Sequence, residues 1–81
     1  MKSLSLNPIR NNMTELSTPE ALILFSYKTP VACRLDKDMN WYKTSKKWSK
    51  TTSRHINQWL DGIHASEKPQ EFFDNLTNGS V

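Results

Sequence analysis

The stretch from Lys43 to Leu60 combines the residue types that bind polyanions. Its basic side chains are Lys43, Lys46, Lys47, Lys50 and Arg54, and it contains no acidic residue. Aromatic residues, including Trp48, are interleaved with them. Ammonium groups pair with phosphate oxygens and aromatic faces stack on bases, so this mixture is typical of backbone-directed or single-strand nucleic-acid binding. We expect these basic residues, with Trp48 and His55, to form a surface for nucleic acid or another polyanion.

The charge distribution supports the same interpretation. The chain has 81 residues and a net charge of +3, yet residues 43–60 alone carry five positive charges, and residues 61–81 carry one basic and four acidic side chains. Such asymmetry favours long-range attraction of anions. Lysine outnumbers arginine, which favours point-charge contacts with phosphates over bidentate reading of bases, so low sequence specificity is expected. The alternative is that the lysines form a solvated face while the tryptophans pack the core.

No catalytic, metal-binding or cofactor-binding pattern is recognisable. One cysteine, Cys33, and two histidines do not make a structural zinc site, and two glycines are too few for a phosphate-cradling loop. Asp36 and Asp38 flank a turn, which explains them. We therefore predict a protein that is not an enzyme, needs no cofactor or metal, and holds Cys33 as a small buried hydrophobe.

The longest apolar run, Ala21 to Phe25, is too short for a membrane span, and the N-terminus lacks a run of signal-peptide length. We predict a cytoplasmic protein that does not associate with membranes and has no small-molecule substrate. If the chain is viral, the compartment would be the host cytoplasm.

A β-meander is the expected centre of the fold. Residues 21–28 and 31–36 are apolar runs of strand length, separated by Thr29-Pro30, and the polar residues 37–40 suit a hairpin turn before a third strand at 41–44. Residues 1–18 show no sustained period and contain a proline, so they are predicted to be a flexible arm. These signals predict a three-stranded antiparallel meander.

Two short helices are expected after the meander, which makes the fold class α+β. Apolar residues at helical spacing follow hydroxyl caps near Thr51: Ile56, Trp59, Leu60 and Ile63. A second helix is predicted after Pro69, with Phe72, Phe73 and Leu76 as its apolar contacts. The predicted organisation is an arm at 1–18, one domain at 19–78 and a tail at 79–81.

Two segments resemble a small uncharacterised domain that recurs in bacteriophage and other microbial genomes. They read Ser-Tyr-Lys-Thr-Pro-Val-Ala from Ser26, and Trp-Tyr-Lys-Thr followed by Lys-Trp-Ser-Lys-Thr-Thr-Ser-Arg-His-Ile-Asn-Gln-Trp-Leu, within about residues 23–60. The resemblance implies a viral or mobile-element origin and brings no established functional residues. The hydroxyl-rich run from Thr51 to Asn57 could be a ligand site or a conformational device that satisfies backbone groups.

Three functions follow in order of preference. The first is a small phage-type binding protein that contacts nucleic acid or another polyanion. The second is a protein-protein interaction module that docks on an acidic surface of a host enzyme or defence complex, where charge complementarity would speed association. The third is a virion or oligomeric accessory protein, for which homo-oligomers would be expected.

Overall fold

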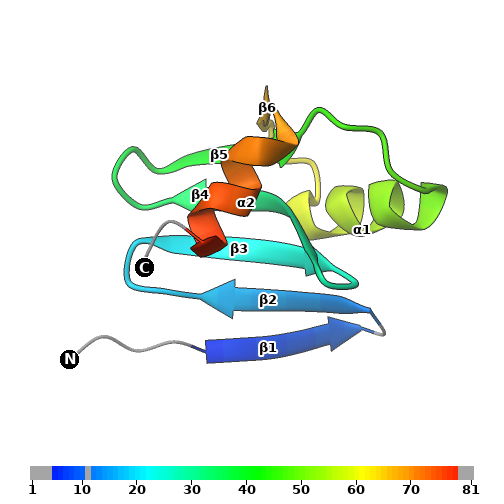
Figure 1. Cartoon of the computed structure of the whole chain (residues 1–81), viewed down its shortest axis with the longest axis horizontal. Helices are drawn as coiled ribbons and strands as arrows, with labels where there is room; N and C mark the ends of the chain where they lie inside the picture. Colours follow the sequence, from blue (N-terminus) through cyan, green and yellow to red (C-terminus); the bar gives the residue numbers. More distant parts are fainter. Residues whose placement is uncertain (1–4, 11, 79–81) are drawn as a thin grey trace.

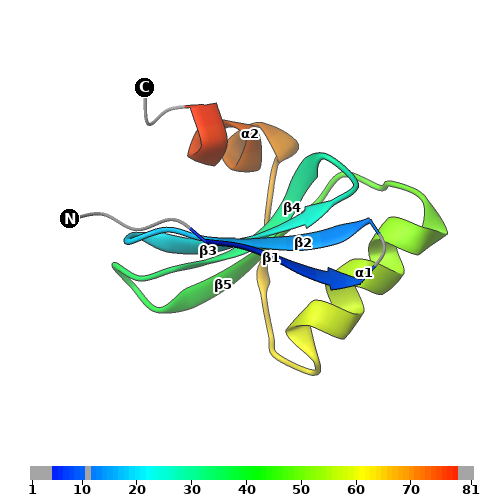
Figure 2. The ribbon, with the colours of Figure 1, turned by 90° about the horizontal axis from the view of Figure 1, so that it is seen from below.

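A six-stranded sheet with one helix on each face forms the protein (Figure 1, Figure 2). The computed structural model describes residues 5–10 and 12–78; the predicted tail at 79–81 lies outside the described residues. The elements in chain order are β1 (Ser5–Arg10), β2 (Met13–Ser17), β3 (Ala21–Ser26), β4 (Thr29–Leu35), β5 (Asn40–Thr44), α1 (Lys50–Leu60), β6 (Ser66–Lys68) and α2 (Gln70–Asn78). The strands are ordered in space as in sequence. The predicted α+β class is confirmed.

The predicted meander is the centre of the sheet. β3, β4 and β5 are consecutive antiparallel neighbours, which confirms that part of the prediction. Tyr27 and Lys28 form the tight connection between β3 and β4, and Tyr27 has a positive φ of 59°. A positive φ is usual in two-residue hairpin turns, because it matches the twist of the strands. Pro30 pairs with Phe25 beside an irregularity in the ladder, where a proline is tolerated.

The sheet is larger than predicted because residues 5–10 and 13–17 are strands and not part of a flexible arm. β1 pairs with β2, and β2 pairs with β3, both antiparallel. Met13 and Leu16 explain why the pattern was hidden: Met13 packs in the core on one face of the sheet and Leu16 packs against the core on the other. Residues that serve opposite faces leave no simple alternation of apolar and polar residues.

The final strand, β6, was also missed. It has three residues and lies parallel to β5, with Thr44 beside Lys68, after a crossover through α1. A strand this short, with two charged residues among its three, gives no periodic signal. The sheet is therefore mixed, with five antiparallel strands and one parallel edge strand.

The two helices cover opposite faces of the sheet, with α1 against β3 and α2 against β4 (Figure 2). Ser49 is the N-cap of α1, because its side chain accepts a hydrogen bond from the Thr52 backbone N–H at 3.2 Å. Asp61 and Gly62, with φ of 47° and 85°, end the helix after Leu60. Ile63 therefore lies beyond the helix and is exposed, contrary to its predicted place on the apolar face.

Each face of the sheet has its own apolar core. The core under α1 contains Met13, Leu24, Val31, Ala32, Ile56, Leu60 and Ala65, with Trp41 and Trp59 packed against it. The core under α2 contains Ala21, Ile23, Cys33 and Phe73, flanked by Phe72 and Leu76 among others. The core roles predicted for Trp59 and for the α2 phenylalanines are confirmed. Within the described residues, neither helix is long and apolar enough to cross a membrane.

Candidate nucleic-acid interface

The basic loop at 45–49 leads from β5 into α1 and is held at both ends. At its start, the Ser45 N–H donates to the Lys68 carbonyl at 2.9 Å, and the Lys46 N–H donates to the Thr44 hydroxyl at 3.2 Å. At its end, Ser49 caps α1. The short strand β6 thus anchors a loop that carries two lysines and a tryptophan.

Gln70, the first residue of α2, fixes the middle of the loop. Its Oε1 accepts hydrogen bonds from the Trp48 indole N–H at 3.1 Å and from the Thr44 hydroxyl at 2.8 Å. Its Nε2 donates to the Pro30 carbonyl at 2.7 Å and to the Asp74 carboxylate at 3.1 Å. Trp48 is consequently held to α2 through Gln70, which is itself hydrogen-bonded to β4 and β5, although 37% of the Trp48 surface stays exposed.

Lys46 lies over the Trp48 ring, with its ammonium nitrogen 4.3 Å from the ring centroid. This cation–π contact is worth about 0.5–1 kcal/mol at an exposed site. It holds one positive charge beside the indole and occupies one face of the ring.

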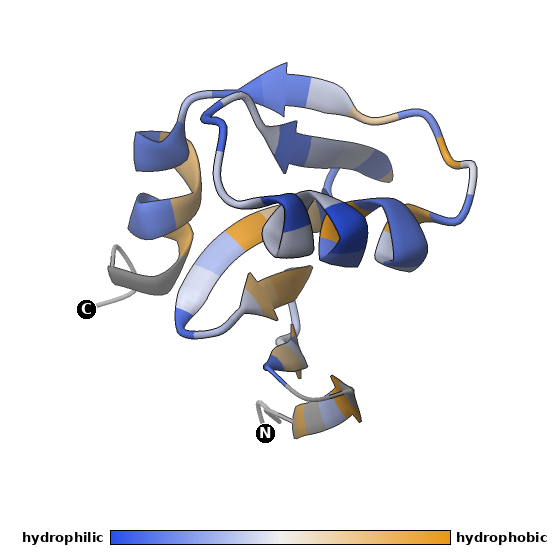
Figure 3. Ribbon diagram, turned by 90° about the vertical axis from the view of Figure 1, so that its right-hand side faces the viewer, coloured by the Kyte–Doolittle hydropathy of each residue, from blue (hydrophilic) through white to orange (hydrophobic). Residues whose placement is uncertain are grey.

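An open groove of about 750 Å³ runs along the outer face of α1 and the adjoining loop. Its lining consists of Lys47, Trp48, Lys50, Ser53, Arg54, Asn57, Gln58 and Asp61. Figure 3, in which α1 faces the viewer, shows this helix as largely hydrophilic above more hydrophobic strands. Three cations and one exposed aromatic ring lie at the N-terminal part of the groove, and the single carboxylate, Asp61, lies at its far end.

The structure brings together most, not all, of the predicted binding residues. Lys47, Trp48, Lys50 and Arg54 line one groove, and Lys46 lies against Trp48. Lys43 is separate from them on β5, where it pairs with Ala32 of β4 and is half-buried.

His55 departs from the prediction because its side chain points into the molecule and is only 7% exposed. Its Nδ1 shares a hydrogen bond of 2.8 Å with the buried Ser26 hydroxyl, which lies 3.0 Å from the Thr52 hydroxyl. The Ser49 hydroxyl donates in turn to Thr52 at 3.4 Å. His55 therefore belongs to a polar network between β3 and α1 and does not line the groove.

The run from Thr51 to Asn57 was interpreted either as a ligand site or as a conformational device, and the structure places its residues on two different faces of α1. Thr52 and His55 face the sheet and satisfy buried polar groups, which is a structural role. Ser53, Arg54 and Asn57 face outward and line the groove. Helical spacing separates neighbours in sequence onto opposite faces, so one motif contributes both to the buried polar network and to the lining of the groove.

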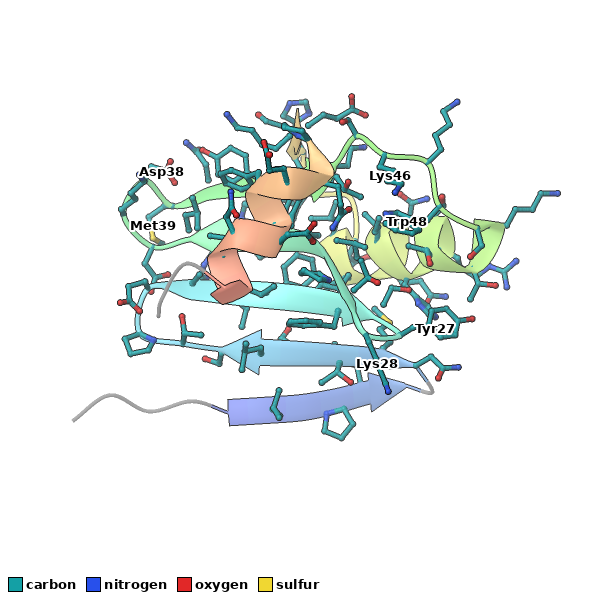
Figure 4. All side chains as sticks on the ribbon, viewed as in Figure 1. Tyr27, Lys28, Asp38, Met39, Lys46 and Trp48 are labelled. Atoms are coloured by element: carbon teal, nitrogen blue, oxygen red, sulfur yellow. The ribbon has the colours of Figure 1, made fainter. Side chains whose placement is uncertain are left out.

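Two exposed residues at the same end of the molecule were missed in the sequence. Figure 4 shows Tyr27 and Lys28, in the turn between β3 and β4, at the end that also carries Lys46 and Trp48, with Asp38 at the opposite end. Tyr27 is 50% exposed. The sequence signal that could have identified them is a tyrosine and a lysine in a turn between two apolar runs, because turns lie on the protein surface.

Cys33 is fully buried in the core under α2, as predicted. Burial raises the pKa of its thiol to about 12, and the Asp38 carboxylate adds to this effect. Within residues 5–10 and 12–78, no three His, Cys, Asp or Glu side chains gather where they could hold a metal ion.

Comparison with known proteins adds a family assignment. A model of a family of unknown function, DUF8033, matches residues 4–75, which is most of the chain. The chain belongs to this family. The residues matched by the DUF8033 model include both segments on which the resemblance to an uncharacterised domain rested, and also β1, β2 and most of α2. No curated protein and no solved structure matches the chain.

Proposed function

We propose that this chain is a binding protein for nucleic acid or another polyanion, with low sequence specificity. The contact surface is the N-terminal part of the α1 groove, formed by Lys47, Trp48, Lys50 and Arg54, together with Lys46. The observation that carries the proposal is that three of these cations line one open groove beside an exposed tryptophan. A viral or mobile-element setting, implied by the sequence resemblance, is part of the proposal.

The position of the cations on α1 supports an anionic partner. A helix N-terminus carries a partial positive charge that acidic residues usually offset, but the first turn of α1 contains none and begins with Lys50. Lys47 and Arg54 add to this unfavourable concentration of positive charge. Local rules are most often broken at functional sites, and a bound phosphate backbone would relieve the repulsion.

The molecule is also electrostatically polar along its length. The turn between β4 and β5, at the end opposite the groove, carries Asp36 and Asp38 with Lys37 between them, and Asp36 pairs with Arg34 at 3.1 Å. The Asn40 backbone N–H and the Tyr42 hydroxyl hold the pKa of the Asp38 carboxyl below its usual range, so Asp38 stays ionised and this turn has no excess of positive charge. A polyanion approaching the protein would be oriented towards the groove end.

The test is a salt titration of binding to labelled single-stranded DNA, single-stranded RNA, duplex DNA and heparin. We expect binding at about 50 mM salt and a linear fall of log K with log salt. Lys47→Gln, Lys50→Gln and Arg54→Gln combined should weaken binding and lower the salt slope by about two for a single strand.

The matched control is Lys37→Gln, which removes one positive charge from the exposed turn at the opposite end. It should leave both affinity and salt slope close to those of the unmodified protein. The proposal fails if none of the four polyanions binds at about 50 mM salt, or if the triple variant binds them as well as the unmodified protein does.

A further inference from the structure

Two exposed aromatic rings lie at the basic end of the molecule. Tyr27 is in the turn between β3 and β4, and Trp48 is in the loop before α1 (Figure 4). Each is adjacent to lysine, Tyr27 to Lys28 in sequence and Trp48 to Lys46 through the cation–π contact. Tyr27 keeps 50% and Trp48 keeps 37% of its surface exposed, so both rings are open to contacts from a partner.

Tyr27 is held in its exposed position by the backbone and by its neighbours. Its backbone N–H donates to the Asn12 carbonyl at 2.6 Å, its φ is 59°, and half of its surface is exposed. Its ring centroid lies 6.0 Å from that of His55, which the Ser26 hydroxyl holds in turn. The tyrosine is therefore supported on its inner side and open on its outer side.

Trp48 is also pre-oriented. The indole N–H is bound to Gln70, whose amide makes three further hydrogen bonds, and Lys46 covers one face of the ring. The ring also contributes to the lining of the groove that contains Lys47, Lys50 and Arg54. An aromatic platform fixed before binding loses little conformational entropy when a ligand stacks on it.

We infer that the partner is a single-stranded nucleic acid whose unpaired bases stack on Tyr27 and Trp48, while its phosphates contact the lysines beside these rings. This inference rests on the proposed function and deepens it. A purely electrostatic surface for polyanions needs no exposed rings, and the bases of a duplex are stacked on one another and cannot stack on side chains. Every base has an aromatic face, so this mode agrees with low sequence specificity.

Gln70 acts as a positioning residue in this arrangement. It does not line the groove, but it accepts the hydrogen bond that fixes the Trp48 indole. Trp48→Phe removes the indole N–H while it keeps an aromatic face, so it should weaken single-strand binding less than Trp48→Ala.

The experiment compares labelled single strands of about 12 nucleotides, within the usual range of site sizes, with an abasic sugar-phosphate strand of equal length and with the matching duplex. DNA and RNA versions of the single strand distinguish the two sources of unpaired bases. We expect each single strand to bind more tightly than the abasic strand, by about five- to 150-fold for each stacked base. The duplex should bind no better than the abasic strand.

The variants are Trp48→Ala and Tyr27→Asn, with Met39→Ala as the control. Asparagine tolerates a positive φ, so Tyr27→Asn removes the ring and keeps the turn. Met39 also has a positive φ and is exposed, but it lies at the opposite end. We expect each aromatic variant to lose about five- to 150-fold in affinity for the single strand and less than about threefold for the abasic strand. Met39→Ala should match the unmodified protein.

Equal affinity for the single and abasic strands, or an unchanged affinity in both aromatic variants, would overturn the inference and leave the proposed polyanion binding intact. Absence of any binding by the unmodified protein would overturn both this inference and the proposed polyanion binding. Circular dichroism and urea unfolding of each variant show whether a loss of affinity comes from a lost contact or from unfolding. Tyr27→Asn and Trp48→Ala lie in different loops, so each variant is an independent test.

Discussion

The Ser26 hydroxyl and the His55 ring nitrogen Nδ1 share a buried hydrogen bond of 2.8 Å that joins the end of β3 to the first half of α1. The Thr52 hydroxyl lies 3.0 Å from the same Ser26 oxygen, so one serine connects two successive inward-facing positions of the helix. The outward-facing Arg54, between them in sequence, lines the groove. The network, together with the packing of Ile56 and Leu60 in the core, fixes the rotation of α1 and the direction in which the groove residues point.

Ser26→Ala should destabilise the fold. The substitution leaves the His55 and Thr52 side chains without their shared buried partner, and an unsatisfied buried polar group costs about 1–3 kcal/mol. Urea unfolding of Ser26→Ala measures this loss directly. Ser53→Ala, on the exposed side of α1, is the control and should change the free energy of unfolding by less than about 0.5 kcal/mol. Equal stability of the two variants would contradict the structural role of the network.

Asp61→Asn should strengthen polyanion binding. Asp61 is the one carboxylate among the groove residues, and asparagine matches its size and accepts the same left-handed backbone at the end of α1. An exposed charge is worth about 0.2–1 kcal/mol, so affinity should rise by about 1.5- to fivefold. Fluorescence anisotropy at about 50 mM salt measures the change. Glu71→Gln removes an equal charge from α2 and should have a smaller effect, and a reversed order would argue against the groove as the contact surface.

Cys33 should make the free energy of unfolding fall at alkaline pH. The pKa of the folded thiol is raised to about 12 from its ordinary value of 9.0, which applies to the unfolded chain. Between these values the unfolded state releases a proton that the folded state keeps, so rising pH favours unfolding by at most about 1.4 kcal/mol per pH unit. Comparing the pH dependence of unfolding in Cys33→Ala with that of the unmodified protein isolates this contribution.

A chemical measurement checks the same burial. A thiol reagent should label Cys33 at pH 8 only as fast as the protein opens, because the thiol is buried and protonated in the folded state. Labelling should become rapid in urea. Rapid labelling of the folded protein would show that the core under α2 is more open than the structure indicates.

Glu15 should contribute to stability through Trp59. The Trp59 indole N–H donates to the Glu15 carboxylate at 2.8 Å, and the Trp59 ring packs edge-to-face on Trp41, with 5.3 Å between centroids. Glu15→Ala removes the acceptor and should cost about 1.5–3 kcal/mol, the range for a hydrogen bond to a charged group. Glu15→Gln keeps an acceptor and should cost less. Urea unfolding followed by tryptophan fluorescence measures both, and an equal loss in the two variants would mean that the hydrogen bond is unimportant.

Local patterns were sufficient to predict the meander and the two helices. Ala21 to Phe25 is a dense apolar run, and the spacing of Ile56, Trp59 and Leu60 is specific to a helix. β1, β2 and β6 were not predictable in this way. Their apolar residues are few, and Met13 and Leu16 pack against opposite faces, so these strands are stabilised chiefly by pairing with neighbours that the sequence does not identify.

The candidate site was predicted in part for a related reason. Lys47, Lys50 and Arg54 carry a positive charge whatever the fold, so the sequence alone identified them as candidates. The orientation of His55, in contrast, depends on which face of α1 packs against the sheet. Only the tertiary structure pairs His55 with Ser26 and brings Tyr27 to the end that carries Trp48. Charge is a property of each residue and can be read along the chain. Direction and proximity arise from packing between segments far apart in sequence, so only the fold could decide them.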